Sequence, residues 1–165
     1  MEEKFLQEEE HGAERSSRFQ AKQDLSKSSV GKSFAEFDIA RIKGNRFSTD
    51  EKLKSKKSID KLFKEGKSVS QNGFTLVYLV EPLPSLYPAQ AGFTVPKKFF
   101  KHAVDRNRIK RLLREAYRLN KSSLYQKLVA GKQQMALMFV YKGKAMPDYD
   151  MVSQIVISCI NRVKI

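Results

Sequence analysis

Residues 74–80 are apolar at every position except Thr75, and they lie between Gly73 and Pro82. The stretch is rich in β-branched and aromatic residues, so it predicts a strand. Successive side chains point to opposite faces of a strand. One face is therefore expected to hold Phe74, Leu76, Tyr78 and Val80, and the other Thr75, Val77 and Leu79.

Two further apolar stretches predict strands. Residues 91–95 form the second strand, which Pro96 ends, and the prolines within 82–88 place a loop before it. Residues 135–141 are apolar without interruption and have strand length. A run of this kind predicts a central strand that is buried on both faces.

Two segments carry helical spacing with clear boundaries. Residues 55–65 predict a helix that Ser55 caps and Gly66 stops, with Ile59, Leu62 and Phe63 in one apolar stripe. The stripe is equally compatible with a core face and with a binding face.

The second helix is expected to begin after Pro147-Asp148, and its apolar residues recur at i, i+3 and i+4, as in a helix packed on a core. The stripe consists of Val152, Ile155, Val156, Cys159, Ile160 and Val163. Cys159 lies on it, which favours an inert buried thiol over a catalytic one.

Residues 106–118 predict a helix with two contrasting faces. At about 100° per residue, an arc of about 120° holds Ile109, Leu112, Leu113, Ala116 and Leu119. An opposed arc of about 140° holds Arg106, Lys110, Arg111, Arg114 and Arg118, with Asn107 among them. Four of these basic residues follow one another at i,i+4 spacing, namely Arg106, Lys110, Arg114 and Arg118. This basic ladder contains no acidic residue.

Such a face can simply be solvated, as most charged helix faces are. Like charges at i,i+4 oppose helix formation, however, so solvated faces usually mix signs. Most of the charge here comes from arginine, whose planar guanidinium suits phosphate. The pattern therefore favours an RNA or DNA ligand.

The net charge of +14 is unevenly distributed over the 165 residues. Residues 1–46 contain nine basic and nine acidic residues, whereas residues 47–165 contain 23 basic and nine acidic ones. The first segment predicts a charged, disordered N-terminal extension, with transient helix at most near 34–42. The second predicts one basic domain that binds a polyanion.

Membrane attachment and protein-borne catalysis are both disfavoured. The sequence has neither a bilayer-length apolar run nor a signal-peptide pattern, and its single cysteine fits a reducing cytosol. The acids of the basic domain form no spaced cluster, and only His11 and His102 are present. The residues alone therefore predict a binding protein without catalytic or metal-ligating residues.

The stretch from Arg106 to Arg114, RNRIKRLLR, resembles the signature of the bacterial ribonuclease P protein component. GFTVPKK at 92–98 stands upstream of it, as a strand and basic turn do in that family. The resemblance runs from about Phe47 to the C-terminus. It implies an α+β fold in which a small mixed four-stranded sheet packs with about three helices, in an αββαβα-like order. It also implies a left-handed crossover through the basic helix, where general rules favour a right-handed one.

The same resemblance implies a function. The protein subunit of ribonuclease P binds the catalytic RNA and the 5′ leader of precursor tRNA, and it assists endonucleolytic removal of the leader. The RNA subunit carries the active site and holds most of the catalytic Mg²⁺. A chain without catalytic residues of its own is what this family leads one to expect.

Two groups of residues match functional positions of the family. The RNA-binding group is Lys97, Lys98, Arg106, Asn107, Arg108, Lys110, Arg111 and Arg114, and Arg118 continues the same face. The leader cleft is expected to contain Ile59, Phe63, Thr75, Val77 and Thr94. Aromatic residues can occur in the family at the positions of Ile59 and Val77, and aliphatic side chains cannot stack on bases in the same way.

Two other functions stay open at this point. One is a basic RNA-binding module that acts alone, such as a ribosome-associated protein. The other is a DNA-binding protein with the basic helix in a major groove, although an almost purely Arg and Lys face suits phosphates more than base edges. A ribonuclease P subunit is expected to bind neither DNA nor a membrane. Its oligomeric state stays open.

Overall fold

The computed structural model describes residues 46–164, so the predictions made for residues 1–45 lie outside the described part. Seven elements follow in chain order: α3 (Lys56–Glu65), β1 (Lys67–Gln71), β2 (Phe74–Val80), β3 (Ala89–Thr94), α4 (Ala103–Ala130), β4 (Met135–Tyr141) and α5 (Tyr149–Asn161). The predicted bounds of β2 and β4 are confirmed, as is an α+β fold with three described helices.

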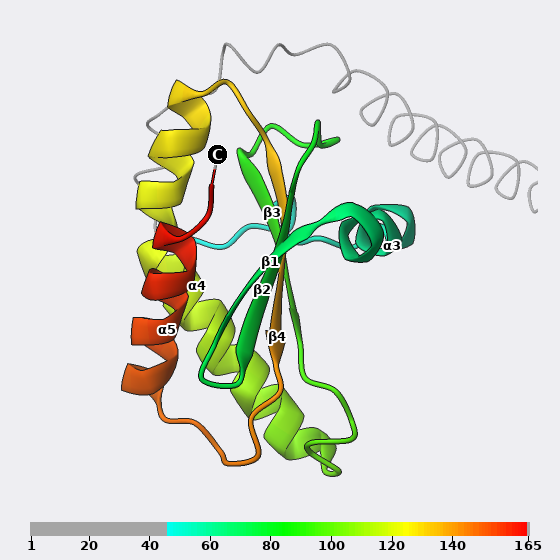
Figure 1. Cartoon of the computed structure of the whole chain (residues 1–165), viewed down its shortest axis with the longest axis vertical. Helices are drawn as coiled ribbons and strands as arrows, with labels where there is room; N and C mark the ends of the chain where they lie inside the picture. Colours follow the sequence, from blue (N-terminus) through cyan, green and yellow to red (C-terminus); the bar gives the residue numbers. More distant parts are fainter. Residues whose placement is uncertain (1–45, 165) are drawn as a thin grey trace, which may run out of the picture. The chain divides into compact units, whose positions relative to one another are not determined.

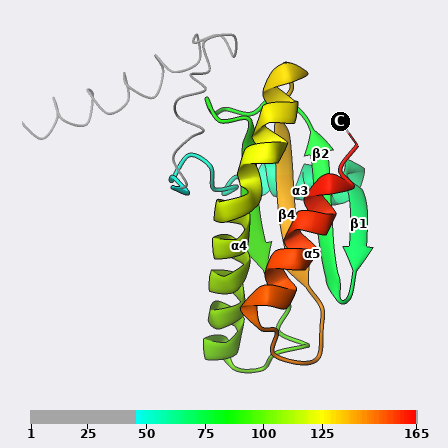
Figure 2. The same cartoon turned by 90° about the vertical axis from the view of Figure 1, so that its left-hand side faces the viewer.

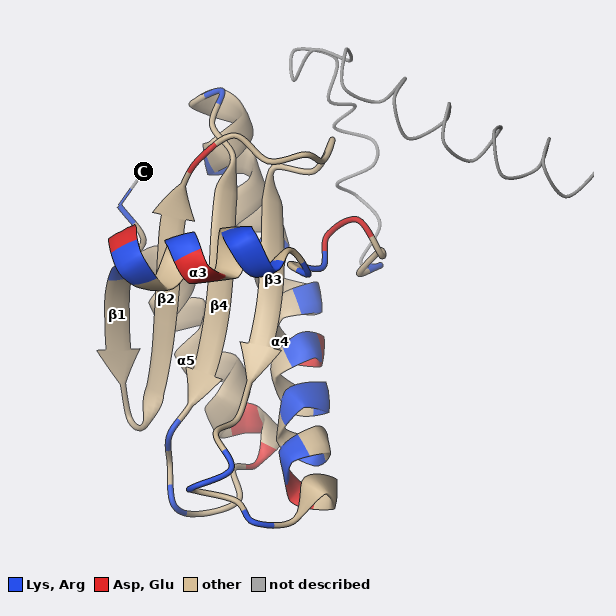
Figure 3. Cartoon of the chain, turned by 90° about the vertical axis from the view of Figure 1, so that its right-hand side faces the viewer, with Lys and Arg blue, Asp and Glu red and all other residues tan. Residues whose placement is uncertain are grey.

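The four strands form one mixed sheet in the order β1-β2-β4-β3. β2 pairs antiparallel with β1 and β4, while β3 and β4 are parallel. Figure 1 shows α4 and α5 on one face of the sheet and α3 on the other. The chain leaves β3, passes through α4 behind the sheet as seen in Figure 3, and returns in β4, which makes this crossover left-handed.

Period-two alternation distributes the strand side chains between two cores. Phe74, Leu76 and Tyr78 of β2 pack into the larger core, which α4 and α5 close. Figure 2 shows these two helices side by side over the sheet. Val77 and Leu79 point the other way, toward Leu62 of α3. All seven residues of β4 are buried, as expected for a central strand covered on both faces.

Local capping signals set the helix ends. The Ser55 hydroxyl accepts a hydrogen bond from the Ser58 N–H, and Gly66 closes α3. The Asp148 carboxylate accepts from the Met151 N–H at the start of α5. These contacts satisfy backbone donors that have no partner within the helix. The predicted stripe of α5 is buried, and Cys159 with it.

The structure corrects the sequence interpretation at two strands. The residues alone did not locate β1, because KSVSQ is polar and lies at the sheet edge. The turn Asn72-Gly73, with φ of 46° and 78°, was the available signal, since this dipeptide favours tight hairpins. β3 begins at Ala89, not at Ala91, because its pairing with β4 continues to Met135.

A segment before α3, residues 46–53, is fixed to the folded part by buried groups. The Phe47 ring lies 5.8 Å from the rings of both Phe93 and Tyr117. The Leu53 N–H donates to the Ala91 carbonyl at 3.1 Å. This segment, called the strap below, therefore continues the fold up to the first described residues.

Candidate nucleic-acid interface

The basic helix of the sequence is the N-terminal half of α4. Its buried side is formed by Ile109, Leu113, Ala116, Tyr117, Lys121, Leu124, Tyr125 and Leu128. On the other side Asn107, Arg108, Arg111 and Arg114 are exposed. The guanidinium of Arg114 lies 6.0 Å from the centre of the Phe93 ring. These side chains offer a dense set of hydrogen-bond donors to an external anion.

Leu119 was placed on the apolar arc, and that prediction is wrong. Its side chain is 40% exposed. The buried side of α4 is centred near Tyr117, Leu124 and Leu128. With a rotation of about 100° per residue, Leu119 points away from that side. The apolar arc predicted from residues 106–118 was centred too close to Leu112, and it therefore included Leu119.

Two arginines of the basic ladder already have partners in the fold. The Arg106 guanidinium donates to the carbonyls of Phe100 and Lys101, at 2.9 and 2.7 Å. Arg118 pairs with Glu115 three residues before it. Hydrogen bonding between the two lowers the pKa of Glu115 and raises the pKa of Arg118. Both arginines are thus less available than Arg111 and Arg114.

Lys97 and Lys98 are exposed in the turn that follows β3. The ammonium of Lys98 lies 4.9 Å from the centre of the Phe99 ring. His102 is exposed at the N-cap position of α4 and makes no side-chain capping bond. The basic pair and the first turns of α4 are therefore joined by a short connection.

The residues predicted to line a cleft lie on the α3 side of the sheet. In the register of the sheet, Thr75 and Thr94 both stand opposite Val140, so the three side chains share one face. Val77 belongs to the same face but is buried, in contact with the core beneath α3. Its exposed surface is consequently small.

Within α3 the three apolar residues have different roles. Leu62 is fully buried and supplies the core contact, whereas Ile59 is half-buried. The Phe63 side chain is 53% exposed. A large aromatic ring that is half in solvent suits a binding surface better than a core. Lys56, Lys57 and Lys64 of the same helix are exposed.

Figure 3 shows these features in one view. α3 crosses the sheet toward one end, and no other described helix lies over this face. The basic half of α4 emerges beside the β3 edge, so its Lys and Arg residues flank the uncovered part of the sheet. The fold thus combines a half-open sheet face with a strongly basic flank.

The acidic side chains are dispersed. Asp148 caps α5, and Glu115 pairs with Arg118. Within residues 46–164, no group of three or more His, Cys, Asp and Glu side chains is arranged to hold a metal ion.

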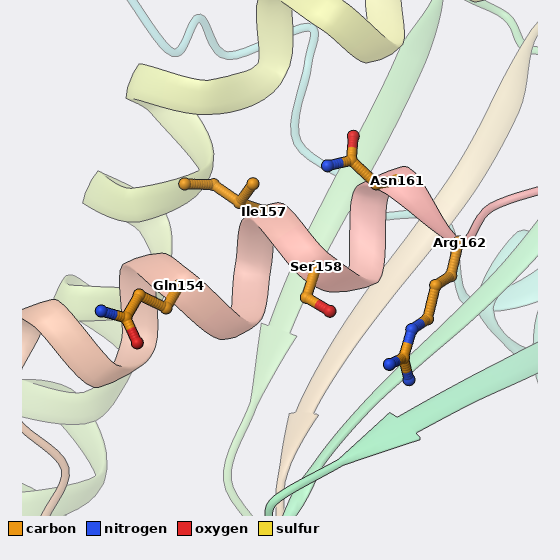
Figure 4. Close-up of a pocket in the computed structure, with 5 residues that line it drawn as sticks. All are labelled: Gln154, Ile157, Ser158, Asn161 and Arg162. Atoms are coloured by element: carbon orange, nitrogen blue, oxygen red, sulfur yellow. The ribbon is translucent and has the colours of Figure 1, made fainter.

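A shallow pocket on α5 was not foreseen from the sequence. Figure 4 shows its lining residues, which are Gln154, Ile157, Ser158, Asn161 and Arg162. The Ser158 hydroxyl lies 2.7 Å from the side-chain oxygen of Gln71. Because α5 covers the sheet face opposite to α3, this pocket is separate from the candidate interface.

Lys142 and Lys144 were not singled out from the sequence either. Both are exposed in the loop after β4, which leaves the same end of the sheet as the turn with Lys97 and Lys98 because β3 and β4 are parallel neighbours. No described helix is long and apolar enough to cross a membrane.

Comparisons with known proteins agree with this geometry. The family model "Ribonuclease P" matches residues 47–164. The ribonuclease P protein component of Chlorobaculum tepidum is 40% identical over 115 residues, which cover 65% of this chain and 74% of the relative. The component of Chlorobium phaeobacteroides is 32% identical over 131 residues, which cover 73% and 90%.

A solved structure of the RNase P protein from Thermotoga maritima, in complex with 1-(4-fluorophenyl)-2-thiourea, has the same fold. Its TM-score is 0.57 at 23% identity, with 68% of this chain and 100% of that chain covered. The family match, the sequence relatives and the shared fold lead to one conclusion. This chain belongs to the Ribonuclease P family, as a protein component of the enzyme that processes tRNA 5′ ends, with the RNA subunit of that enzyme as its partner.

Proposed function

We propose that the chain serves ribonuclease P by holding two RNAs on two adjoining surfaces. The basic side of α4 binds the backbone of the catalytic RNA near the cleavage site. The α3 side of the sheet binds the 5′ leader of precursor tRNA. The observation that carries the proposal is that these two surfaces adjoin along the β3 edge (Figure 3).

Exposure supports the first assignment. Asn107, Arg108, Arg111 and Arg114 reach solvent together, and Lys110 is half-buried beside them. Phosphate contacts position an RNA through charge and hydrogen bonds and carry little sequence information. A face made of guanidinium groups fits that role. Arg106 contributes by fixing the connection before α4, since its guanidinium holds two backbone carbonyls.

The sheet face supports the second assignment. Phe63 provides an exposed aromatic ring at one side, and Thr75 and Thr94 provide hydroxyl groups on the strands. Stacking contributes roughly 1–3 kcal/mol per base where an aromatic residue is present. Because Ile59 and Val77 are aliphatic and Val77 is buried, Phe63 is the main candidate for stacking on a leader base.

We place the catalytic Mg²⁺ mainly on the RNA subunit. The acids that the structure describes are engaged as helix caps or ion pairs, or stand apart, and none forms a three-ligand cluster. The protein's own contribution in this proposal is to bind and orient the two RNAs. A cytoplasmic location fits the buried free thiol of Cys159.

The deciding experiment is cleavage of precursor tRNA by the cognate RNA subunit at low Mg²⁺, with and without the protein. We expect the protein to lower the Mg²⁺ needed for cleavage and to tighten substrate binding. The protein alone, free of nucleic acid, is expected not to cut. If the protein binds RNA but leaves cleavage unchanged at every Mg²⁺ concentration, it is a stand-alone RNA-binding module.

A further inference from the structure

The two borders of the sheet differ. The strap covers β3, since the Leu53 N–H donates to the Ala91 carbonyl at 3.1 Å and the Ala91 N–H donates to the Glu51 carbonyl at 2.8 Å. β1 stands at the other border (Figure 3), and no described segment pairs with its outer side. We propose that this open edge, together with the pocket on α5 beside it, is a docking surface for an acidic, extended segment of a partner protein.

The pairing of β2 shows which backbone groups of β1 are free. The Lys142 N–H donates to the carbonyl of Gly73, just before β2, so the odd-numbered residues of β2 bond to β4. Its even-numbered residues bond to β1, opposite positions 67, 69 and 71 of that strand. The backbone N–H and C=O groups of Ser68 and Ser70 therefore point outward, away from the sheet.

Small side chains leave this edge accessible. Ser68 and Ser70 are exposed, and the Ser70 hydroxyl lies 3.0 Å from the hydroxyl of Thr75 on β2. Neither serine has the charge or the bulk with which edge strands commonly prevent pairing. An extended segment of another protein can add to such an edge through main-chain hydrogen bonds.

The pocket on α5 borders the same edge. The Ser158 hydroxyl in the pocket donates to the side-chain oxygen of Gln71, the last residue of β1, at 2.7 Å. Ile157 is 40% exposed, and Gln154 and Asn161 lie about one helical turn before and after it (Figure 4). An apolar side chain flanked by amide groups suits recognition of a peptide side chain.

Three cations near the first residue of β1 favour an acidic partner. Lys67 stands opposite Tyr78, whose hydroxyl accepts a hydrogen bond from the Lys164 N–H at 3.5 Å. Arg162 follows α5 as its C-cap and lines the pocket. These three basic residues are exposed, and none belongs to the ion pairs found among residues 46–164. Glu65 is close in sequence but belongs to α3, on the other face of the sheet.

Charge and backbone chemistry together select this occupant. A second copy of the chain, paired through its own β1, would bring the same three cations toward each other, and like charges disfavour such an interface. RNA would satisfy the cations but lacks the alternating N–H and C=O groups that an open strand edge binds. An acidic, extended peptide segment satisfies both.

The test measures binding of a fluorescein-labelled synthetic peptide of about seven residues, alternating Val and Glu, to the full chain by fluorescence anisotropy. We expect binding that weakens as salt is added. N-methyl groups on every second residue block the pairing in one frame but not in the other. One of the two N-methylated peptides should therefore bind at least about tenfold more weakly than the other.

Ser68→Pro tests the edge from the side of the protein. It removes an outward N–H that β2 does not use, and proline is tolerated at such edge positions. Peptide affinity should fall about tenfold. The matched control, Ser68→Thr, keeps the N–H and should stay within about twofold of wild type. If melting shows that Ser68→Pro is unfolded, the two N-methylated peptides decide the question on the wild-type chain.

Arg162→Gln with Lys164→Gln tests the charges. Peptide affinity should fall about threefold and its salt dependence should shrink. The matched control is Lys56→Gln with Lys57→Gln, which removes two exposed charges from α3 on the other face of the sheet and should change neither quantity.

Equal binding of both N-methylated peptides, or no binding of the parent peptide up to about 1 mM, would overturn the proposal. Sedimentation of the full chain checks the other protein occupant: a dimer that Ser68→Pro dissociates would identify a second copy and exclude the acidic partner. The RNA subunit should leave peptide binding unchanged, because the pocket lies on the sheet face opposite to α3. Displacement of the peptide by that RNA would assign the edge to RNA and would also overturn the proposal.

Discussion

Lys121 of α4 and Glu51 of the strap form an ion pair inside the protein, although they stand 70 positions apart in the sequence. Their exposures are 2% and 1%. The Lys121 ammonium also donates to the Arg46 carbonyl at 2.6 Å, and the Tyr125 hydroxyl donates to the Glu51 carboxylate at 2.6 Å. The second carboxylate oxygen accepts from the Ser48 N–H. A buried pair with this many hydrogen bonds fixes the strap to α4.

Substituting Lys121 with Met should therefore destabilise the protein strongly. It leaves Glu51 buried without its cation, and removal of one partner of a buried pair costs about 3–5 kcal/mol. Urea unfolding followed by circular dichroism measures the loss. Adding Glu51→Gln should recover part of it, because the stranded charge is then gone.

The exposed pair of Glu115 and Arg118 provides the comparison for that measurement. Glu115→Gln should leave the urea midpoint almost unchanged, since solvent screens an exposed pair. If Lys121→Met lowered the urea midpoint as little as Glu115→Gln, the buried pair would not be anchoring the strap.

The strap also sets where the N-terminus can be shortened. A protein that begins at Arg46 keeps Phe47, Glu51 and Leu53, so its melting temperature should stay within about 5 °C of the full chain, roughly 1 kcal/mol. A protein that begins at Ser55 loses all three and leaves Lys121 unpaired. Its melting temperature should fall much further. Calorimetry of the three proteins decides whether residues 1–45 add stability.

Neighbouring residues of α3 allow the binding surface to be separated from the core. Phe63→Ala should weaken binding of precursor tRNA and change stability little, because half of the ring is already in solvent. Leu62→Ala removes a fully buried side chain and should cost about 2–5 kcal/mol of folding free energy. Parallel melting and substrate-binding measurements test both. A large stability loss with Phe63→Ala and unchanged affinity would place Phe63 in the core.

Strands β2 and β4 and the helix caps were predictable because local signals set them. An apolar stretch between Gly73 and Pro82 defined β2, a continuous apolar run defined β4, and Ser55 and Asp148 marked helix starts. Long-range relations were not predictable. Nothing near Lys121 in the sequence reveals a buried cation, because its partner lies 70 positions away. The left-handed crossover goes against the general rule and came only from the family resemblance.

The candidate interface was predictable to a similar extent. The α4 signature identified the exposed Arg111 and Arg114, but it could not reveal that Arg106 holds backbone carbonyls of the preceding loop. Lys142 and Lys144 carry no local signal at all. Their relation to Lys97 and Lys98 depends on the parallel pairing of β3 with β4, which no short sequence pattern records.

The thiol of Cys159 should be unreactive in the folded protein. Burial raises its pKa, so the thiolate fraction at pH 8 is smaller than for a free cysteine. We expect a disulfide reagent to modify Cys159 slowly at pH 8 and rapidly in denaturing urea. Fast modification of the native protein would mean that α5 opens readily from the sheet.

The basic side of α4 offers the clearest separation of binding from folding. Arg111 and Arg114 are exposed and form no ion pair among the described residues, so neither is needed to close the core. Replacing both with Gln keeps good helix formers and removes two mutually repelling charges. Stability should hold or rise slightly. Affinity for the ribonuclease P RNA should fall, and the slope of log affinity against log salt should shrink by about 1 to 2.

The loss should be larger for the ribonuclease P RNA than for an isolated leader, because the leader is assigned to the sheet face. Arg118→Gln is the matched control, since Arg118 lies on the same helix but already pairs with Glu115. It should reduce the salt slope less than either Arg111→Gln or Arg114→Gln alone. If the Arg111 and Arg114 double variant kept both the wild-type salt slope and normal holoenzyme assembly, the basic side would be merely solvated. The catalytic RNA would then have to bind elsewhere on the domain.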